Sequence, residues 1–246
     1  MMASLLVDIG NTNIKSAIYS NGCLSDRRTF SVNASDPIDM FETHWLSDGE
    51  RPDKVLVSNV STPSVAKALA SFSKIHFDTV IKIVKPVKSY KGMKTEYEDP
   101  ERLGVDRWLA SLAAWVRCRS NVCVVDVGTA LTVDVVTAAG LHLGGLIAPG
   151  PTLMQQSLAS GAAELVRAEL SEVEFFGTNT VDAMSLGCLS AFGGIFNTVE
   201  HRLESLGLRE VVWYLTGGGA EVIASQIPAA FISVPDLVLD GLAEIN

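Results

Sequence analysis

The sequence contains few cysteines, and these show no pattern of a metal or redox site. The four cysteines form no Cys-x-x-Cys pair and have no histidine at the spacing of a zinc site. We therefore expect reduced, structural thiols and a cytoplasmic protein. The four residues are Cys23, Cys118, Cys123 and Cys188.

Long uninterrupted hydrophobic runs are also absent. The longest stretch without Asp, Glu, Lys or Arg covers residues 135–163, but His142, two prolines and two glutamines interrupt it. A membrane-spanning helix needs about 20 consecutive apolar residues. At the N-terminus the chain reaches Asp8 and Gly10 before a signal-peptide core of adequate length can form. The sequence therefore predicts neither a membrane span nor a secretory leader.

Positive charge is in short supply. There are 19 Lys and Arg against 28 Asp and Glu, which gives a formal net charge of −9. Affinity for nucleic-acid phosphates comes from clustered Lys and Arg, so we expect a small-molecule partner rather than a nucleic acid. With 48% apolar and 19% charged residues, the chain is also too hydrophobic to be intrinsically disordered. Its 246 residues fit one large domain or two smaller ones.

Two similar segments stand about half a chain apart. Residues 5–12, Leu-Leu-Val-Asp-Ile-Gly-Asn-Thr, and residues 122–129, Val-Cys-Val-Val-Asp-Val-Gly-Thr, are both apolar runs that end in Asp-x-Gly and a threonine. Their aspartates, Asp8 and Asp126, are 118 residues apart. A β-rich run that leads an Asp into a glycine turn is typical of a β-hairpin. The repetition predicts two similar α/β halves, residues 1–117 and 118–246.

The remaining pattern fits this division. Apolar spacing predicts a long helix over residues 180–206, although Gly187, Gly193 and Gly194 each cost roughly 1 kcal/mol relative to Ala inside a helix. These glycines indicate close approach of another backbone. Further elements are predicted over residues 53–58 (strand), 63–72 (helix), 80–84 (strand), 103–117 (helix) and 211–215 (strand).

The Asp-x-Gly turns carry groups that suit phosphate. Glycine lets backbone N–H groups approach oxyanions, Asn and Thr add neutral donors, and an Asp can hold a metal ion directly or through water. Residues 8–15 supply all of these groups. An ordinary hairpin with an Asx-type turn is the alternative for one copy, but two copies half a chain apart favour nucleotide binding.

A third glycine-rich turn follows the strand predicted over residues 211–215. There Thr216-Gly217-Gly218-Gly219 leads into a predicted helix, so that a phosphate or a flat ligand can lie against bare backbone. The alternative is a tight connection between a strand and a helix.

Five motifs in order resemble those of type III pantothenate kinase over nearly the whole chain. The motif at 97–107 is the specific one, because Asp-x-Gly turns alone indicate only the wider actin, sugar kinase and Hsp70 superfamily. Thr178, where the family often has a basic residue, and Val166, where a proline often follows Leu165, depart from the pattern. The five motifs are Asp-x-Gly-Asn-Thr-x-x-Lys (8–15), Tyr-x-x-Pro-x-x-Leu-Gly-x-Asp-Arg (97–107), Asp-x-Gly-Thr-Ala-x-Thr (126–132), Gly-x-Asn-Thr (177–180) and Thr-Gly-Gly (216–218).

The resemblance implies a fold and a reaction. The expected fold is α/β, with two similar ribonuclease H-like (actin-like) domains and the nucleotide site in the cleft between them. The expected activity, carried by a homodimer, is transfer of the γ-phosphoryl group of ATP to pantothenate, which gives 4′-phosphopantothenate in coenzyme A biosynthesis. Two alternatives stay open: another phosphotransferase or phosphohydrolase of the superfamily, and a non-catalytic ATP-binding regulatory or assembly protein.

The resemblance also implies residues for the acceptor side of the reaction. Asp106 is the expected proton acceptor, and the Arg107 fork suits the carboxylate of pantothenate. The alternative is that these two side chains form a surface ion pair on the first turn of a helix. The expected pantothenate contacts are Tyr97, Gly104, Val105, Asp106, Arg107 and, from the neighbouring subunit, Thr180.

The resemblance also implies that the nucleotide binds at both Asp-x-Gly turns and at the glycine-rich turn. Asp8 is expected to hold magnesium, directly or through water, and Asp126 a monovalent cation, potassium or ammonium. The alternative for Asp126 is that its carboxylate caps the N–H groups of its own turn. A second carboxylate beside the phosphates would repel ATP unless a cation lay between them. The expected contacts with ATP and Mg²⁺ are Asp8, Gly10, Asn11, Thr12, Asn13, Lys15, Thr129, Gly217 and Gly218.

Overall fold

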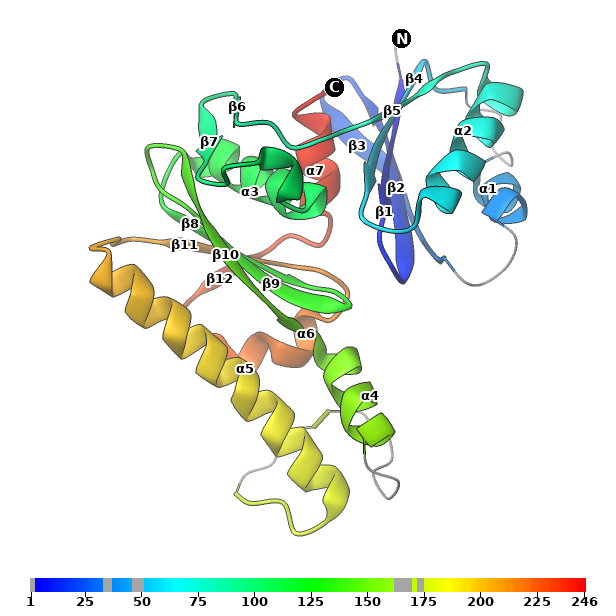
Figure 1. Ribbon diagram of the computed structural model, residues 1–246. Helices are drawn as coiled ribbons and strands as arrows, with labels where there is room; N and C mark the ends of the chain where they lie inside the picture. Colours follow the sequence, from blue (N-terminus) through cyan, green and yellow to red (C-terminus); the bar gives the residue numbers. More distant parts are fainter. Residues whose placement is uncertain (1–2, 33–36, 46–50, 162–169, 172–174) are drawn as a thin grey trace. The chain divides into compact units, whose positions relative to one another are not determined.

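The computed structural model describes residues 3–32, 37–45, 51–161, 170–171 and 175–246 (Figure 1). The chain forms two compact units, Met1–Arg117 with Asp236–Asn246 and Cys118–Pro235. The division expected from the sequence differs at its end, because it assigns residues 236–246 to the second half. Val166 lies outside the described residues. None of the described helices is long and apolar enough to cross a membrane.

The first unit is built on a five-stranded mixed sheet. Its strands are β1 (Ser4–Ile9), β2 (Asn13–Ser20), β3 (Cys23–Ser31), β4 (Lys54–Asn59) and β5 (Ile81–Ile83). They lie in the order β3-β2-β1-β4-β5. β1 and β2 pair antiparallel, which confirms the first predicted hairpin, and β4 and β5 run parallel to β1 on its other side.

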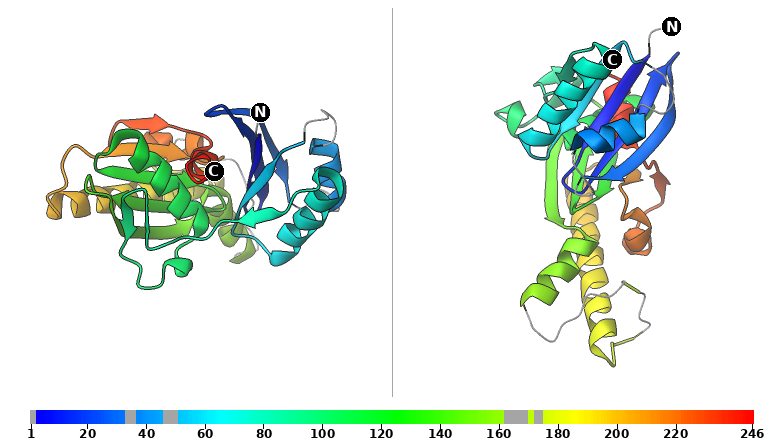
Figure 2. Two further views of the ribbon diagram at one scale, coloured as in Figure 1. Left: turned by 90° about the horizontal axis from the view of Figure 1, so that it is seen from above. Right: turned by 90° about the vertical axis from the view of Figure 1, so that its right-hand side faces the viewer.

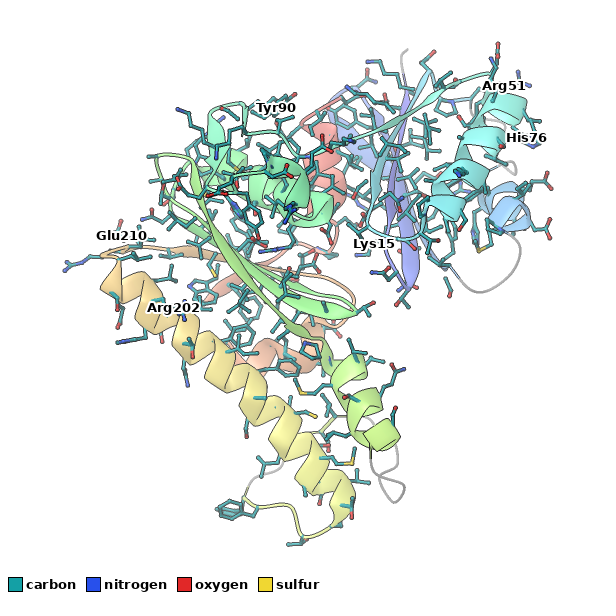
Figure 3. All side chains as sticks on the ribbon, viewed as in Figure 1. Lys15, Arg51, His76, Tyr90, Arg202 and Glu210 are labelled. Atoms are coloured by element: carbon teal, nitrogen blue, oxygen red, sulfur yellow. The ribbon has the colours of Figure 1, made fainter. Side chains whose placement is uncertain are left out.

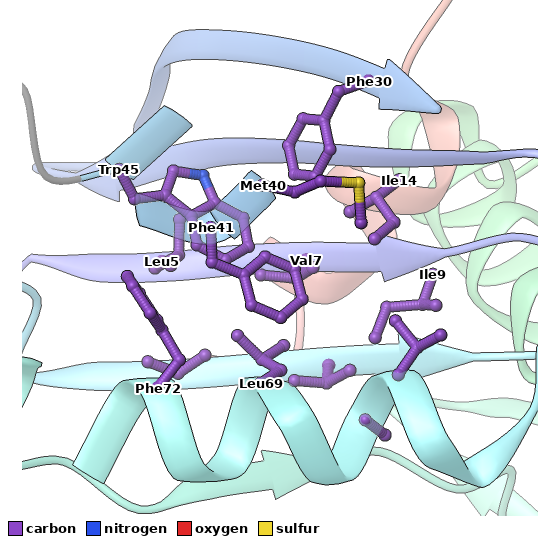
Figure 4. Close-up of a cluster of buried hydrophobic side chains, with 14 of the residues drawn as sticks. Leu5, Val7, Ile9, Ile14, Phe30, Met40, Phe41, Trp45, Leu69 and Phe72 are labelled. Atoms are coloured by element: carbon purple, nitrogen blue, oxygen red, sulfur yellow. The ribbon is translucent and has the colours of Figure 1, made fainter. Parts of the chain in front are cut away.

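One face of this sheet is covered by helices α1 (Pro37–Trp45) and α2 (Pro63–Phe77). Alternation along β1 sends Leu5, Val7 and Ile9 to this face, where aromatic side chains of the two helices pack against them (Figure 4). This layer is the hydrophobic core of the first unit.

Helix α2 begins where the sequence predicts and ends later. Pro63 occupies the first turn, where its missing N–H costs nothing. The helix continues past residue 72 because Phe77 is buried, and it ends at Asp78, which is left-handed with φ 52°.

The opposite face of the first sheet is covered by the C-terminal helix α7 (Leu237–Ala243) (Figure 1). Leu6 of β1 and Leu237 and Leu242 of α7 are completely buried. This packing explains why residues 236–246 belong to the first unit. The unit also contains β6 (Ser89–Tyr90), β7 (Met93–Thr95), the 3₁₀ turn η1 (Pro100–Arg102) and α3 (Val105–Cys118).

The second unit repeats this strand arrangement. Its strands are β8 (Val122–Val127), β9 (Ala130–Val136), β10 (Leu141–Pro149), β11 (Val212–Thr216) and β12 (Phe231–Ser233). They lie in the order β12-β11-β8-β9-β10. β8, β9 and β10 form antiparallel pairs, and β11 and β12 run parallel to β8, as β4 and β5 do to β1. The two similar α/β halves expected from the repeated motif are therefore confirmed.

A long helix, α5 (Thr180–Ser205), packs on the sheet of the second unit, as predicted over residues 180–206. Phe192 and Phe196 of this helix are completely buried in the second core. Helix α4 (Pro151–Gly161) lies beside α5 (Figure 2). The short helix α6 (Ala220–Ile223) and the 3₁₀ turn η2 (Ala224–Gln226) follow β11.

Candidate functional site

The first Asp-x-Gly turn joins β1 to β2. The Gly10 N–H donates to the carbonyl oxygen of Asn13 at 3.0 Å, and a Cβ on Gly10 would lie 3.0 Å from the same oxygen. Glycine therefore permits this close turn. Asn11, Thr12 and Asn13 are exposed at its tip.

Three polar side chains share one face of the sheet next to this turn. Asp8 near the end of β1 lies opposite Lys15 on β2 and in register with Ser58 on β4. Residues paired in this way have neighbouring side chains. Asp8 Oδ1 is shielded from solvent. Figure 3 shows Lys15 near the hairpin end of the sheet, and its ammonium lies 3.7 Å from Asp236 Oδ1.

Sequence reasoning missed Ser58 as a candidate site residue. Its hydroxyl is completely buried and has no hydrogen-bond partner among the described residues. The sequence predicts only a strand over residues 53–58. Ser58 lies beside Asp8 because β4 runs parallel to β1 in a particular register. The two strands are far apart in sequence, so this register can be seen only in the folded structure.

The second Asp-x-Gly turn joins β8 to β9 and has a similar form. The Gly128 N–H donates to the carbonyl oxygen of Ala130 at 2.9 Å, and Thr129 is exposed at the tip. The Gly150 N–H donates to the Thr129 carbonyl oxygen at 2.9 Å. A Cβ on Gly150 would overlap the carbonyl oxygen of Gly128, so this position requires glycine.

The sequence analysis did not predict that Gly150 packs against the second Asp-x-Gly turn. The run Pro149-Gly150-Pro151 does predict a sharp turn between a strand and a helix. What the turn packs against is a long-range contact, and the sequence alone does not reveal it.

The glycine-rich turn after β11 lies directly against Asp126. Gly217 has φ +92°, and a Cβ there would lie 2.5 Å from both Asp126 Oδ1 and the Val127 carbonyl oxygen. The Gly219 N–H donates to that carbonyl at 2.9 Å. Gly218 has open space around it. The structure thus brings together Asp126 and the glycine-rich turn, two motifs 90 residues apart.

The oxygens around Gly217 suit a cation. A carboxylate oxygen and a carbonyl oxygen lie beside the same glycine, and oxygen ligands are those that hard cations bind. Within the described residues, no three or more His, Cys, Asp or Glu side chains gather as a metal site. Magnesium bound with a nucleotide typically takes one or two protein carboxylates and completes its shell with phosphates and water. Asp8 and Asp126 are each a candidate carboxylate for such a site.

The motif at residues 97–107 forms one connected structure in the first unit. Asp99 Oδ1 accepts a hydrogen bond from the Glu101 N–H at 3.1 Å and so caps η1. Arg107 Nη1 donates to the Tyr97 hydroxyl at 3.3 Å. Arg107 is only 8% exposed. The alternative in which Asp106 and Arg107 form an ion pair on the surface therefore does not hold for Arg107.

Asp106 is half-buried in the first turn of α3. Its Oδ1 accepts a hydrogen bond from the Arg107 backbone N–H at 2.8 Å, and a Cβ on Gly104 would lie 2.6 Å from that oxygen. Glycine at 104 therefore leaves room for the carboxylate. The helix N-terminus favours its negative charge. Val105 is buried and contributes to packing.

The motif at residues 177–180 starts helix α5. Asn179 Oδ1 caps the helix by accepting from the Asp182 N–H at 3.0 Å. A Cβ on Gly177 would overlap the backbone of Ala183, so this turn requires glycine. Thr178 and Thr180 are exposed, which leaves their hydroxyl groups available for contact.

Comparison with protein families connects these residues to known proteins. A family model described as type III pantothenate kinase matches residues 4–202. A type III pantothenate kinase from Nitrosomonas eutropha is 36% identical over 245 residues, covering 98% of this chain and 93% of the relative. One from Nitrosococcus oceani is 33% identical over 247 residues, covering 98% of this chain and 92% of the relative.

Solved structures show the same fold. A Baf family protein from Campylobacter jejuni is 24% identical, with a TM-score of 0.62 over 98% of this chain and 96% of that one. A ROK family glucokinase from Streptomyces griseus, crystallised with glucose and AMPPNP, is 11% identical, with a TM-score of 0.54 over 99% and 98%. The two repeated halves are therefore the two domains of an actin-like α/β fold, as expected.

Proposed function

The chain belongs to the type III pantothenate kinase family, and on this premise we propose which of its residues carry the transfer of a phosphoryl group from ATP to pantothenate. The family match covers residues 4–202, and the relatives align over 98% of the chain. The observation that carries the assignment of the site is the motif at 97–107, in which buried Arg107 contacts Tyr97 beside Asp106. The product is 4′-phosphopantothenate, a precursor of coenzyme A.

Arg107 and Tyr97 bind pantothenate in this proposal. A guanidinium offers paired N–H donors that match a carboxylate, and a partly buried one binds more strongly than a surface one. The hydrogen bond to the Tyr97 hydroxyl fixes the guanidinium in place before substrate arrives. Gly104 and Val105 complete the acceptor site through backbone contacts, and Thr180 reaches pantothenate from the neighbouring subunit.

Asp106 removes the proton from the primary hydroxyl group of pantothenate. A carboxylate lies at the start of α3, where the helix dipole favours negative charge, and it can accept a proton as the oxygen attacks phosphorus. The hydrogen bond from the Arg107 N–H holds one carboxylate oxygen in place at the start of the helix.

ATP and magnesium use the turn after β1. Gly10, Asn11, Thr12 and Asn13 present donors at an exposed turn, and Asp8 holds the metal ion directly or through water. When bound, magnesium neutralises charge that develops on the phosphates. From the second unit, Thr129, Gly217 and Gly218 contact the nucleotide. Lys15 supplies the positive charge that faces the phosphates.

Asp126 binds a potassium or ammonium ion in this proposal. Its carboxylate oxygen and the Val127 carbonyl oxygen both lie beside Gly217, which supports a cation site at this turn. A bound cation offsets the repulsion between Asp126 and the phosphates of ATP.

The active protein is a homodimer in the cytoplasm. Gly187 and Gly194 on α5 have open space around them in the described structure, which supports close approach of a second copy.

All four cysteines are free, and burial raises the pKa of the Cys123 and Cys188 thiols, so these two are structural. Free thiols suit a reducing compartment. With a net charge of −9, the expected partner is a small molecule and neither a nucleic acid nor a membrane.

A coupled ADP-release assay with three acceptor conditions tests this proposal. We expect ADP release with pantothenate and background rates with glucose or without acceptor. Release with another acceptor alone would indicate a different phosphotransferase, release without acceptor would indicate a phosphohydrolase, and no release would indicate a non-catalytic relative.

For the cation site, activity should fall sharply when sodium replaces potassium at equal ionic strength and return with ammonium. A rate indifferent to that exchange would remove the monovalent site.

A further inference from the structure

The carboxylate of Asp236 holds Lys15 in the first unit. Asp236 precedes α7, and its Oδ1 lies 3.7 Å from the Lys15 ammonium. Its Oδ2 lies 3.0 Å from Nε of Arg27 on β3. The Asp236 side chain is 20% exposed and that of Lys15 is 25% exposed, so solvent screens their pairing less than it would screen a fully exposed pair.

The strand register explains why Lys15 benefits from this partner. Lys15 lies directly opposite Asp8, and neighbouring opposite charges on paired strands attract each other. The lysine side chain is long and flexible, so its ammonium can reach several positions. A lysine drawn onto Asp8 would compete with a metal ion for that carboxylate. A second acid that pairs with the ammonium limits this competition.

We propose that Asp236 is a positioning residue for ATP binding, which holds the Lys15 ammonium in place for the phosphates. This inference rests on the proposed function, in which Lys15 and Asp8 bind ATP and its metal ion. Arg27 shares the same carboxylate, so the Asp236 side chain holds two cations at once.

Asp236 also joins α7 to the sheet, and a purely structural role has to be separated from positioning. Asp240 on the same helix provides the matched control. It pairs with Arg117 at the end of α3 and forms no ion pair with Lys15 among the described residues. Burial raises the pKa of Asp240, as do the nearby Asp236 and Glu244 carboxylates, while Arg117 and Arg27 act in the opposite direction. Asp240→Asn therefore removes a carboxylate of α7 from the same surroundings without removing the partner of Lys15.

The experiment compares steady-state kinetics and thermal unfolding of the full-length wild type, Asp236→Asn, Asp240→Asn, Lys15→Ala and the double variant Lys15→Ala/Asp236→Asn. We expect Asp236→Asn to raise KM for ATP about 3- to 10-fold, the effect of losing a partly shielded charge pair, with KM for pantothenate unchanged. Asp240→Asn should change Tm but not KM for ATP. The double variant should match Lys15→Ala, because Asp236 acts through the lysine.

The outcomes distinguish this inference from the proposed function. If Lys15→Ala raises KM for ATP and Asp236→Asn does not, the positioning role is wrong while the lysine assignment stands. If Asp236→Asn and Asp240→Asn raise it equally, the effect is structural and the inference is overturned. If Lys15→Ala leaves KM for ATP unchanged, the assignment of Lys15 to ATP in the proposed function fails, and the inference fails with it.

Discussion

Asp106 is held at the start of α3 by a hydrogen bond that an amide side chain can also accept. Asp106→Asn keeps an oxygen for the Arg107 N–H, so the fold and ATP binding should be preserved. The amide cannot take a proton, and we expect kcat to fall by roughly 10²- to 10⁴-fold, the usual contribution of a positioned general base. Steady-state kinetics with pantothenate measures this loss.

Asp99→Asn provides the control for this prediction. Asp99 caps η1 in the same motif, and an asparagine can replace it as a cap. We expect this variant to keep wild-type turnover. Near-normal turnover in Asp106→Asn would contradict the assignment of Asp106 as the base.

Gly217 cannot accept a side chain without moving the site. Its φ of +92° is unfavourable for other residues, and an added Cβ would lie 2.5 Å from Asp126 Oδ1. We expect Gly217→Ala to destabilise the protein by about 1–3 kcal/mol and to lower Tm by several degrees. Differential scanning calorimetry measures the change.

Gly218→Ala is the matched variant one residue later. Gly218 has open space around it, so its Tm should stay close to that of the wild type. Equal Tm values for Gly217→Ala and Gly218→Ala would show that the close approach of Gly217 to Asp126 is not a constraint.

At the scale of elements, the sequence was sufficient where the signals are local. The alternation and glycine turns predict both hairpins, and the apolar period of residues 180–206 predicts α5 to within one residue at its end. Helix α2 was predicted too short, because its end depends on the burial of Phe77 in the core. Local sequence does not encode what a helix end will pack against.

The errors concern contacts between distant segments. Residues 236–246 were assigned to the second half, but Leu237 and Leu242 pack on the first sheet. Ser58 and the proposed positioning residue Asp236 were not predicted, because each meets its neighbours through strand register or through an ion pair between segments far apart in sequence. The candidate residues in the glycine turns were predictable, since a glycine next to an acid is a local pattern.

A buried hydrogen bond joins strands β9 and β10 in the second unit. His142 Nε2 lies 2.8 Å from Asp134 Oδ1, and both side chains are at most 2% exposed. Removing the imidazole leaves the buried Asp134 carboxylate without this hydrogen bond. We therefore expect His142→Ala to destabilise the protein by about 3–5 kcal/mol. Chemical denaturation measures the free energy of unfolding.

His201→Ala controls for the loss of an imidazole. His201 is exposed on α5, and its removal should change the free energy of unfolding by less than about 0.5 kcal/mol. The same small effect in His142→Ala would show that the buried pair contributes little.

At the scale of the whole molecule, the proposed homodimer links assembly to the pantothenate site. We expect sedimentation at the mass of a dimer, and we expect Gly194→Leu to shift it toward monomer, because a large side chain would block close approach at this open position. The monomer should show a higher KM for pantothenate, since it lacks Thr180 from a neighbour. A fully active wild-type monomer would contradict this arrangement.

The repeated topology places an aspartate at the end of the central strand in each half, and the two acids have different proposed roles. Asp8 lies beside Lys15 and Ser58, whereas Asp126 lies beside Gly217. The surroundings, rather than the shared Asp-x-Gly motif, therefore distinguish the proposed magnesium site from the proposed potassium site. An identical fold element can serve two chemistries when the adjacent strand differs.

Detection of the reaction product tests the central claim most directly. Purified protein is incubated with ATP, magnesium, potassium and pantothenate, and the small molecules are separated and identified by mass spectrometry. We predict that pantothenate gains one phosphoryl group to become 4′-phosphopantothenate, with one ADP formed for each product molecule. Unchanged pantothenate in the presence of correctly folded protein, shown by its circular dichroism and cooperative unfolding, would contradict the account.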